Sequence, residues 1–434
     1  MTRIVLVGAG SVEFTRNLLG DFLSYPELHD AEIVLHDIDS DRLTTAERMA
    51  RWTAEALGAR PRIEAHLDRR TALEGADFVV DTIQVGGARA TQIDFDIPAR
   101  YGLQYTINDT INVGGVMRGL RTIPVVLGIV HDIEEVCPDA WFLNYTNPMS
   151  MLIWAVSETS EVRTVGLCHS VYWTVHAIAG YLGIDPAEID HLSAGVNHLA
   201  FLLRLERRGQ DLYPALERAV RDGRIPDDDL VRAELYRRLG YYPTESSEHH
   251  AEYNPWFIPK ADLAERFNVP IGEYLSRVAR NLDEFAETKR RLDAGESFEI
   301  ERSGEYAAVI VHALLCAEPA RIVGNVPNRG AVIPNLDADA CVEVPCLVDG
   351  LGVQPIAVGL LPRQCAAYVR PAVDTQGLTV RAALDRNRDA IYHAVMQDPQ
   401  VQARLTLDES WRMTDELIAA EAEWLPAWLG GTAG

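Results

Sequence analysis

The sequence predicts an α/β protein built on a mostly parallel sheet, and two observations lead to this prediction. Short apolar runs alternate with amphipathic stretches, such as residues 44–57, through the first 168 residues. Such alternation is typical of parallel strands joined by helices that cover both faces of a sheet. The first apolar run also ends in "VGAGSV", a glycine turn that leads directly into a helical pattern.

The parallel part is expected to contain six strands, at residues 3–7, 32–36, 62–67, 77–83, 141–144 and 162–168. Residues 205–259 are polar, aromatic and interrupted by prolines, and "CVEVPCLVDGLGV" is typical of antiparallel or mixed strands. Helices are expected over residues 303–316 and 380–396. Because no flexible linker divides the chain, we expect a first domain of residues 1–168 and a second α+β domain of residues 169–434, interleaved across a shared cleft.

Composition narrows the class of protein. Lys and Arg number 40 against 64 Asp and Glu, which gives a net charge of −24. A surface this acidic argues against nucleic acid and anionic membranes as partners, because both carry the same sign of charge. No apolar run is expected to span a membrane, and no secretion signal precedes the first strand. Six cysteines without a Cys-x-x-Cys pair do not form a disulfide framework, so we expect a reducing cytoplasm.

The opening turn has the features of a dinucleotide site. Gly8 and Gly10 permit a tight turn close to a pyrophosphate, and the helix that begins near Ser11 offers free backbone N–H groups. The next strand ends in Asp37, where a carboxylate accepts hydrogen bonds from both ribose hydroxyls and repels a 2′-phosphate. Glu13 stands at the place of the usual third glycine. The pattern predicts a Rossmann-type fold that binds NAD rather than NADP; the alternative is a plain strand-to-helix turn.

A thiol and an imidazole suggest a second cofactor. Cys168 ends a predicted parallel strand, at the edge where open α/β sheets bind ligands, and His198 follows another glycine-containing turn in "AGVNHLAF". One thiolate and one imidazole leave a divalent ion with open positions for a substrate. The alternative is a buried core cysteine. His249 and His250 offer further ligands, although a solvated polar turn is the simpler interpretation of their segment.

Two further segments are candidate walls of a site. Both place amide or charged side chains near a glycine turn or a strand end, where a helix cap or turn role is the alternative. These side chains are Asp109, Asn112, Arg118 and Arg121 in "INDTINVGGVMRGLRTIP", and Asn144 and Asn147 in "FLNYTNPMSM".

With these motifs in order along nearly the whole chain, the sequence resembles the NAD- and manganese-dependent glycosidases of glycoside hydrolase family 4, most closely its bacterial α-galactosidase branch. The segments that carry the resemblance are "GAGSVEFTRNLLGD", "DIDSDRL", "GGVMRGLRTIP", "EVCPDAWFLNYTNPMSM", "VGLCHSV", "AGVNHLAF", "LGYYPTESSEHHAEYNPWF", "VEVPCLVD" and "EWLPAWL". It implies a sheet similar to that of lactate and malate dehydrogenases, with NAD in the first domain and metal, substrate and subunit contacts in the second.

The resemblance also implies a chemistry. NAD⁺ takes hydride from sugar C3, which makes the neighbouring C2 proton acidic, and Mn²⁺ held by Cys168 and His198 stabilises the resulting charge. A base removes the C2 proton, the aglycone leaves, water adds at C1, and the hydride returns to the sugar. No net oxidation takes place.

The resemblance also implies roles in proton transfer and substrate binding for residues at positions that match the family pattern. His169 is expected to be the acid that assists the leaving group. Tyr241 is the predicted base at C2, with Tyr242 and Tyr253 as alternatives. The substrate-side positions are Asp109, near metal and substrate, Arg118 and Asn147.

The "CHS" segment, Cys168 to Ser170, implies a non-phosphorylated α-galactoside as substrate. Tyr172 and Trp173 depart from the family pattern, so an α-glucoside or α-galacturonide is the alternative substrate. An NAD-dependent 2-hydroxy acid dehydrogenase and a non-catalytic NAD or sugar sensor are the alternative functions. A homodimer or homotetramer is expected from the resemblance.

Overall fold

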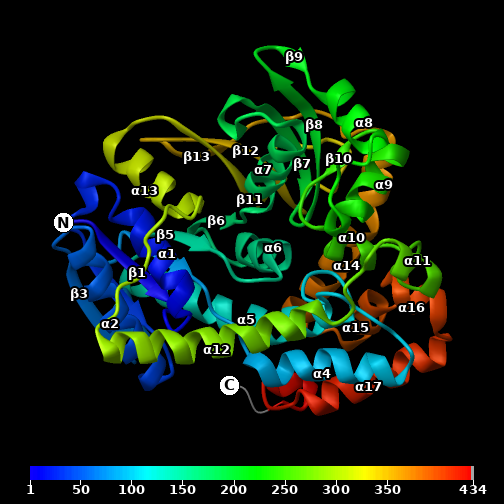
Figure 1. Cartoon of the computed structure of the whole chain (residues 1–434). Helices are drawn as coiled ribbons and strands as arrows, with labels where there is room; N and C mark the ends of the chain where they lie inside the picture. Colours follow the sequence, from blue (N-terminus) through cyan, green and yellow to red (C-terminus); the bar gives the residue numbers. More distant parts are fainter. Residues whose placement is uncertain (432–434) are drawn as a thin grey trace.

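The computed structural model describes residues 1–431, apart from the side chains of Glu13 and Ala261, and confirms the α/β class (Figure 1). The parallel part contains β1 (Arg3–Val7), β2 (Glu32–His36), β3 (Arg62–His66), β4 (Phe78–Asp81), β5 (Trp141–Asn144) and β6 (Arg163–Leu167). These strands lie in the order β3-β2-β1-β4-β5-β6, all parallel. This is the strand order of a dinucleotide-binding fold.

Helices connect these strands and cover both faces. They are α1 (Val12–Phe22), η1 (Pro26–Leu28), α2 (Ser40–Ala56), α3 (Arg69–Leu73), α4 (Gly87–Arg100), α5 (Val113–Val136), α6 (Met149–Thr159) and α7 (Ser170–Leu182). Apolar side chains on their inner faces join the buried strands in one large core. The predicted strands all exist, because runs such as residues 3–7 are buried on both faces, as a parallel sheet requires.

The second part continues the same sheet with antiparallel strands. These are β7 (Asp190–Val196), β8 (Leu199–Arg207), β9 (Gln210–Asp211), β10 (Tyr242–Pro243), β11 (Ala320–Pro327), β12 (Cys341–Asp349) and β13 (Gly352–Pro355). From β6 the order runs β11-β12-β7-β8-β10, with β13 beside β12 and β9 beside β8. β11 pairs with β6 through Gly324 opposite Leu167 and Asn325 opposite Gly166. One sheet therefore passes through both parts of the chain.

Helices fill the connections of the second part, and the last helices of the chain pack against the first part. The former are η2 (Pro186–Glu188), α8 (Tyr213–Arg221), η3 (Asp227–Asp229), α9 (Leu230–Leu239), α10 (Ser247–Glu252), α11 (Ala261–Arg266), α12 (Glu273–Ala294) and α13 (Tyr306–Cys316). The latter are α14 (Arg363–Asp385), α15 (Arg388–Val395), α16 (Pro399–Arg404), α17 (Leu407–Ala420) and η4 (Ala427–Leu429). α14 and α15 pack against α5, so the C-terminal helices share a core with α4 and α5.

One predicted helix is two helices. The apolar pattern of residues 380–396 continues across a break, because Arg386 adopts a left-handed conformation that ends α14. Asn387 then caps α15 by accepting hydrogen bonds from the backbone N–H groups of Asp389 and Ala390. The cap residue, rather than the hydrophobic pattern, marks the boundary.

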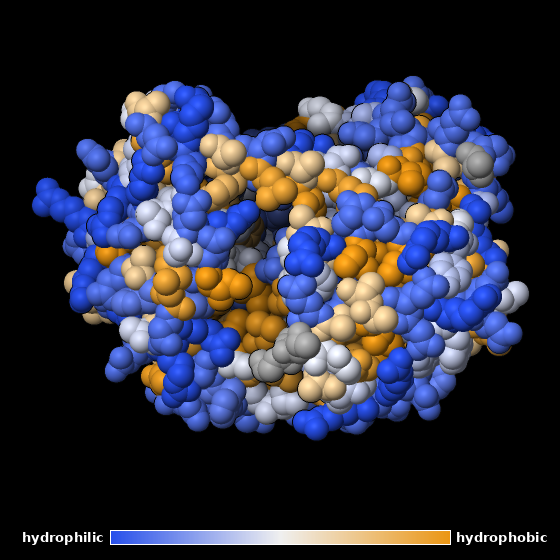
Figure 2. All heavy atoms as spheres, turned by 90° about the horizontal axis from the view of Figure 1, so that it is seen from below, coloured by the Kyte–Doolittle hydropathy of each residue, from blue (hydrophilic) through white to orange (hydrophobic). Residues whose placement is uncertain are grey.

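The expectation that no apolar stretch reaches the length of a membrane span is wrong for α5. This helix is long and apolar enough to cross a membrane, but most of it is buried inside the protein. Its apolar composition reflects a core position between α4, α6 and α14. From below, the surface is mostly hydrophilic, and hydrophobic side chains gather around a hollow near the centre of that face (Figure 2).

A buried ion-pair group fastens α5 to its neighbours. Arg121, a candidate site wall in the sequence, instead donates to Asp94 of α4 at 2.7 Å and to Glu421 at 2.9 Å, with a side chain only 1% exposed. Both carboxylates are buried as well. Removal of one member would leave uncompensated charge in the core.

We predict that Arg121→Met lowers the free energy of unfolding by about 3–5 kcal/mol, because Asp94 and Glu421 lose their buried cation. Urea-induced unfolding followed by circular dichroism measures this. Arg100→Met is the matched control: Arg100 pairs with Glu416 on the surface, so we expect a loss below about 1 kcal/mol. Equal losses in the two variants would contradict a structural role for the buried group.

Candidate active site

The opening glycine turn leaves no space for side chains. Gly8 has φ of 85°, and a Cβ there would lie 2.9 Å from the backbone nitrogen of Ile83. A Cβ on Gly10 would lie 2.5 Å from Asp37 Oδ2, whose carboxylate accepts a hydrogen bond from the Gly10 N–H at 2.8 Å. Ser11 is the N-cap of α1, and its side chain makes no capping hydrogen bond. The first turn of α1 is therefore available to an anion, beside a carboxylate at the end of β2.

A thiol, an imidazole and a carboxylate meet at the same carboxyl edge of the parallel sheet. Cys168 directly follows β6, His198 lies in the turn between β7 and β8 with φ of 62°, and Glu245 follows β10 with φ of 71°. Their ligand atoms all lie within 4.8 Å of one another. The structure thus brings the two predicted metal ligands together and adds a carboxylate that sequence analysis missed. We call these three residues the metal cluster.

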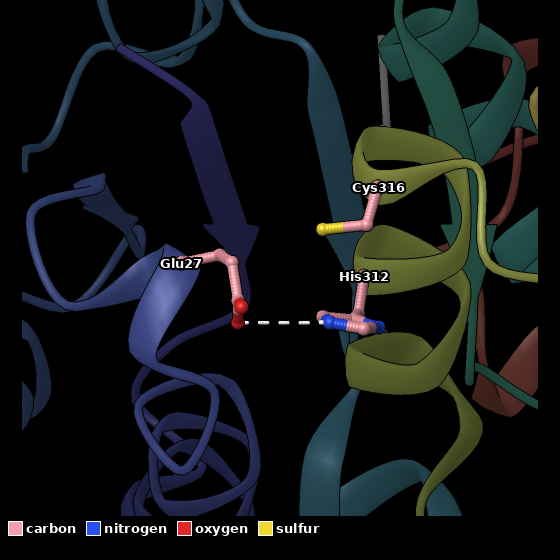
Figure 3. A group of neighbouring side chains, drawn as sticks. All are labelled: Glu27, His312 and Cys316. Carbon is pink, nitrogen blue, oxygen red and sulfur yellow. Dashed lines mark ion pairs between the residues drawn. The ribbon is translucent and has the colours of Figure 1, made fainter.

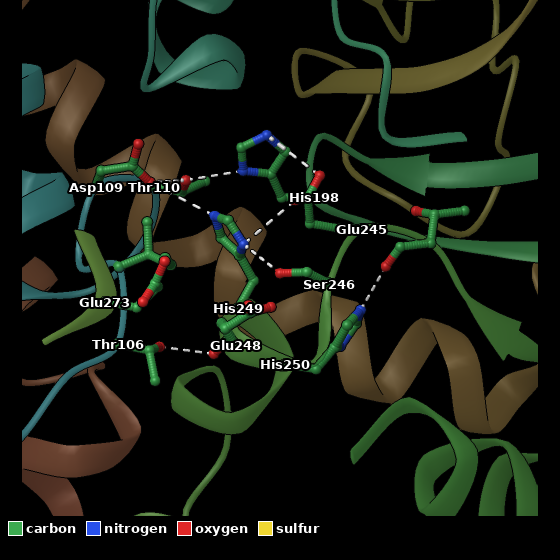
Figure 4. Close-up of polar contacts among 12 residues, drawn as sticks. Thr106, Asp109, Thr110, His198, Glu245, Ser246, Glu248, His249, His250 and Glu273 are labelled. Carbon is green, nitrogen blue, oxygen red and sulfur yellow. Dashed lines mark hydrogen bonds and ion pairs between the residues drawn. The ribbon is translucent and has the colours of Figure 1, made fainter. Parts of the chain in front are cut away.

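Asp109 and His249 form a second possible ligand group together with His198, which also belongs to the metal cluster (Figure 4). His249 Nδ1 lies 3.3 Å from Glu245 Oε1, and its Nε2 lies 3.7 Å from Asp109 Oδ1. Thr110 Oγ1 is 3.0 Å from His198 Nδ1, which fixes the orientation of that ring.

The solvated polar turn expected around His249 and His250 is wrong. Both residues are buried, and they lie on the short helix α10. His249 faces Asp109 and Glu245 in the site, whereas His250 Nε2 contacts the Thr244 carbonyl at 2.7 Å and supports the backbone. The polar character of the segment comes from its contacts inside the site, which is why composition alone suggested a surface turn.

The electrostatics of the metal cluster suit a cation. Removal from water and the carboxylates of Glu245 and Glu343 raise the pKa of the Cys168 thiol to about 12. Burial would raise the pKa of Glu245, but His198, His249 and His169 outweigh it and lower this pKa to about 2. Divalent ions deprotonate coordinating thiols, so this donor set of sulfur, nitrogen and oxygen fits a metal ion chemically.

Asp109 is held by charge and by its loop. Arg118 Nη1 donates to Asp109 Oδ2 at 3.2 Å and to the Tyr274 hydroxyl at 2.9 Å. Burial would raise the pKa of Asp109, but the neighbouring His249 imidazole and the charge of Arg118 outweigh it and lower the pKa below its usual value. Asn147 Nδ2 lies 3.5 Å from the same carboxylate. The three predicted substrate-side residues therefore converge on one point.

Two buried carboxylates anchor the loop that carries Asp109. Glu252 accepts hydrogen bonds from the backbone N–H groups of residues 106–108, and Asp398 accepts from the Val113 N–H and from Asn112 Nδ2. Asn112, a candidate wall residue, thus acts as a structural anchor. The anchors come from α10 and the turn before α16, far along the chain.

His169 is positioned by a carboxylate that sequence analysis did not single out. Its Nδ1 lies 2.6 Å from Glu305 Oε1, just before α13, while the ring remains about half exposed. Loss of water around the ring would lower the pKa of His169, but the hydrogen bond and charge of Glu305 outweigh it and raise the pKa to about 9. The imidazole is therefore protonated at neutral pH and can donate a proton from its free edge.

The three candidate tyrosines have different surroundings. Tyr241 packs against Tyr213, with ring centroids 6.3 Å apart, and within residues 1–431 no described hydrogen bond joins it to the metal cluster. The Tyr242 hydroxyl donates to buried Asp229 at 2.6 Å. Tyr253 is buried beside His249, with ring centroids 5.7 Å apart. Tyr253 is thus the tyrosine of the three that lies against the site in this structure.

Glu343 is a further residue that sequence analysis missed. It lies in β12, completely buried, and accepts hydrogen bonds from Asn197 and Asn325 at 3.2 and 3.3 Å. Burial raises the pKa of Glu343 to about 7, although both amide donors and His198 oppose the shift. The sequence did contain a signal for this residue: Glu343 stands inside the apolar run "CVEVPC", and a buried carboxylate needs hydrogen-bond partners.

A cavity of about 470 Å³ opens beside the metal cluster. Trp173 stands at its edge with half of its surface exposed, whereas Tyr172 packs on His176. The lining includes His169, Ser170, Trp173, Thr174, Asp229, Arg232, Glu245 and Arg277. A space of this size accepts a small-molecule substrate next to His169.

Structural comparison supports the predicted dehydrogenase-like sheet. A putative glucosidase LplD of Bacillus subtilis superposes with a TM-score of 0.87 at 24% identity, covering 96% of this chain and 99% of the other. A 6-phospho-α-glucosidase from gut microorganisms, solved in complex with NAD and Mn²⁺, gives 0.85 at 20% identity, covering 98% and 99%. Malate dehydrogenase from Plasmodium falciparum gives 0.52 at 13% identity, covering 90% and 100%. These similarities establish the fold.

Sequence comparison identifies the protein family as well as the fold. The α-galactosidase of Bacillus subtilis strain 168 is 41% identical over 98% of this chain and 99% of its own length, and that of Rhizobium meliloti is 38% identical over 98% and 89%. An α-glucosidase of Erwinia rhapontici is 31% identical over 98% and 99%. A model described as family 4 glycosyl hydrolase matches residues 3–184, and one described as its C-terminal domain matches residues 193–401. The chain therefore belongs to family 4 of the glycosyl hydrolases.

Proposed function

We propose that this glycoside hydrolase is an NAD- and Mn²⁺-dependent α-galactosidase that cleaves non-phosphorylated α-galactosides. The observation that carries the proposal is the metal cluster, which lies at the same sheet edge as a glycine turn without space for side chains. Relatives named α-galactosidase, at 41% and 38% identity over 98% of the chain, support the choice of sugar. A dehydrogenase has no need of the thiol ligand, and a sensor would be free to lose it.

The glycine turn would hold the dinucleotide. Gly8 and Gly10 bring backbone close to a pyrophosphate, α1 directs its first N–H groups at it, and Asp37 would turn from the Gly10 N–H to the ribose hydroxyls. When bound, NAD⁺ supplies reversible oxidation of the sugar at C3. A carboxylate at the end of β2 disfavours the additional phosphate of NADP.

Cys168 and His198 would hold the metal ion, with Glu245 as a further donor beside them. When bound, Mn²⁺ supplies Lewis acidity at the sugar hydroxyls. The His198 ring is oriented for this role by Thr110, and His249 keeps Glu245 ionised from the other side.

The other site residues would orient the sugar and move protons. Asp109, fixed by Arg118, and Asn147 would contact sugar hydroxyls, while His169 donates a proton to the leaving oxygen. Tyr241 stays our predicted base at C2, and Tyr253, which is buried beside His249, is the alternative supported by contacts.

The cations of the cavity argue for a substrate without phosphate. Arg232 forms a buried ion pair with Asp229, and Arg277 pairs with Glu248 and Glu273. A phosphate or carboxylate on the sugar would have to compete with these partners for the guanidinium groups. A neutral galactoside needs only hydrogen bonds to its hydroxyls. Within a cytoplasmic homodimer or homotetramer, which we also propose, each chain would supply its own copy of this site.

The substrate prediction compares nitrophenyl α-galactoside, α-glucoside, α-galacturonide and their available 6-phosphates, each with NAD⁺ and Mn²⁺ and with each cofactor omitted. We expect the highest kcat/KM for the α-galactoside without phosphate. We expect no turnover when NAD⁺ is omitted and none when Mn²⁺ is omitted. A tenfold preference for another sugar, about 1.4 kcal/mol of transition-state binding, would overturn the choice of galactoside. Turnover without NAD⁺ would overturn the redox chemistry itself.

The metal prediction concerns Cys168→Ser. We expect kcat to fall by at least about 10³-fold, because Lewis-acid stabilisation is lost, while NAD⁺ affinity measured by calorimetry stays unchanged. Chelator treatment of the wild type should have the same effect, reversed by Mn²⁺. Cys316→Ser, at another partly exposed cysteine, is the control and should keep its activity. Full activity of metal-free Cys168→Ser would refute the ligand assignment.

The pH prediction concerns Glu305→Gln. Since Glu305 raises the pKa of His169 to about 9, wild-type kcat/KM should fall as pH rises through about 9, where the acid loses its proton. Without that carboxylate, the loss of water around the ring should lower the pKa, so the basic limb should move down by more than about one unit. Glu301→Gln, at an exposed carboxylate nearby, should leave the limb in place. An unshifted limb in Glu305→Gln would contradict the role of His169.

A further inference from the structure

Away from the active site, three more side chains of the kinds that bind metal ions lie together between the first and second parts of the chain. Figure 3 shows Glu27 on η1 facing His312 and Cys316 on α13. His312 and Cys316 are four residues apart, so they lie one turn apart on the same face of the helix. A carboxylate from one element thus faces an imidazole and a thiol from another.

The distances suit a small tetrahedral ion. The three ligand atoms all lie within 4.8 Å of one another, and His312 Nε2 is 3.6 Å from Glu27 Oε2. Zinc bonds of about 2.0–2.3 Å place tetrahedral ligand atoms roughly 3.3–3.6 Å apart, so only a small closure of the side chains is needed. The Glu27 side chain is 50% exposed and Cys316 is partly exposed, which leaves an entry path from solvent.

The imidazole is already oriented. The His312 ring stacks on Tyr25, with centroids 4.3 Å apart and planes inclined by 24°. The Arg302 guanidinium lies over the Tyr25 ring at 4.7 Å and donates to Ser24. Because packing restricts the ring before any ion arrives, less side-chain freedom is lost on binding.

We propose that Glu27, His312 and Cys316 form a peripheral metal site that binds Zn²⁺, with water as the fourth ligand. A thiolate and an imidazole on one helix face favour zinc over the harder ions Mn²⁺ and Mg²⁺, which prefer oxygen ligands. We call this group the peripheral site. It rests on its own geometry and does not depend on the proposed substrate.

The position of the peripheral site gives it a structural role. α13 begins directly after Glu305, and before it Ser303 donates its N–H to Asp21 at the end of α1 at 2.8 Å. An ion between Glu27 and the last turns of α13 would fasten the other end of this helix to the same region of the first part. The proposed ion would therefore add to the stability of α13 and take no part in catalysis.

Co²⁺ substitution tests the proposal, because a thiolate bound to Co²⁺ gives a charge-transfer absorption band that can be counted per chain. Chelator-treated protein is titrated with Co²⁺ as wild type, Cys168→Ser, Cys316→Ser and the double variant, each checked for folding by circular dichroism. We expect two thiolate–Co²⁺ centres in the wild type, one in each single variant and none in the double variant. Glu27→Gln in the Cys168→Ser background should weaken Co²⁺ binding at the peripheral site at least about tenfold.

Activity and stability separate the two sites. Cys316→Ser should keep the basal activity, whereas Zn²⁺ should raise the Tm of Cys168→Ser in a concentration-dependent way and fail to do so in the double variant. His131→Ala is the control for an exposed histidine beside Glu134 and Glu135, and should keep the full number of centres. The absence of a thiolate–Co²⁺ band in Cys168→Ser, or a band in that variant that remains when Cys316 is also changed, would overturn the proposal.

Discussion

The active site depends on the antiparallel pairing of β11 with β6, which joins the two parts of the chain into one sheet. A Cβ on Gly166 of β6 would lie 2.9 Å from Asn325 Cβ of β11 and 2.4 Å from Met149 Sδ of α6, so the two strands and the helix meet here without space for a side chain. Because β11 pairs with β6, β12 and then β7 follow in the sheet, and these strands carry Glu343 and, just after β7, His198 toward Cys168. Cys168, one residue beyond β6, can meet a histidine from the second part only because the sheet continues across this seam.

Around the seam, buried carboxylates serve as anchors for the backbone. Glu252 and Asp398 accept several backbone N–H groups of the loop that carries Asp109, and Arg121 with Asp94 and Glu421 fixes the helix that follows it. Each group is costly to bury and becomes favourable only when all partners are present. The loop is therefore held in one conformation from several distant points of the chain, which is the precision that a catalytic loop requires.

The charges of the site are balanced around a position for a cation. Asp109, Glu245 and Glu343 surround two imidazoles and one thiol, and burial raises the pKa of Glu343 to about 7 while the histidines keep Glu245 ionised. A divalent ion would stabilise the thiolate and the carboxylates together, because it places a positive charge among them. The same logic applies on a smaller scale to Glu27, His312 and Cys316, where one carboxylate faces a thiol and an imidazole.

The parallel strands, the glycine turn with Asp37 and the candidate ligands Cys168 and His198 could be predicted from the sequence, because strand periodicity and turn chemistry are local properties. The positions of Glu245, His249, Glu305 and Glu343 beside them depend on the tertiary structure. Glu245 and His249 lie in a polar segment, Glu305 precedes a helix and Glu343 lies inside a strand. Each reaches the site through contacts between distant parts of the chain, which no local pattern encodes. For the same reason Arg121 and Asn112 proved to be anchors: their partners, Glu421 and Asp398, lie about three hundred residues further along the chain.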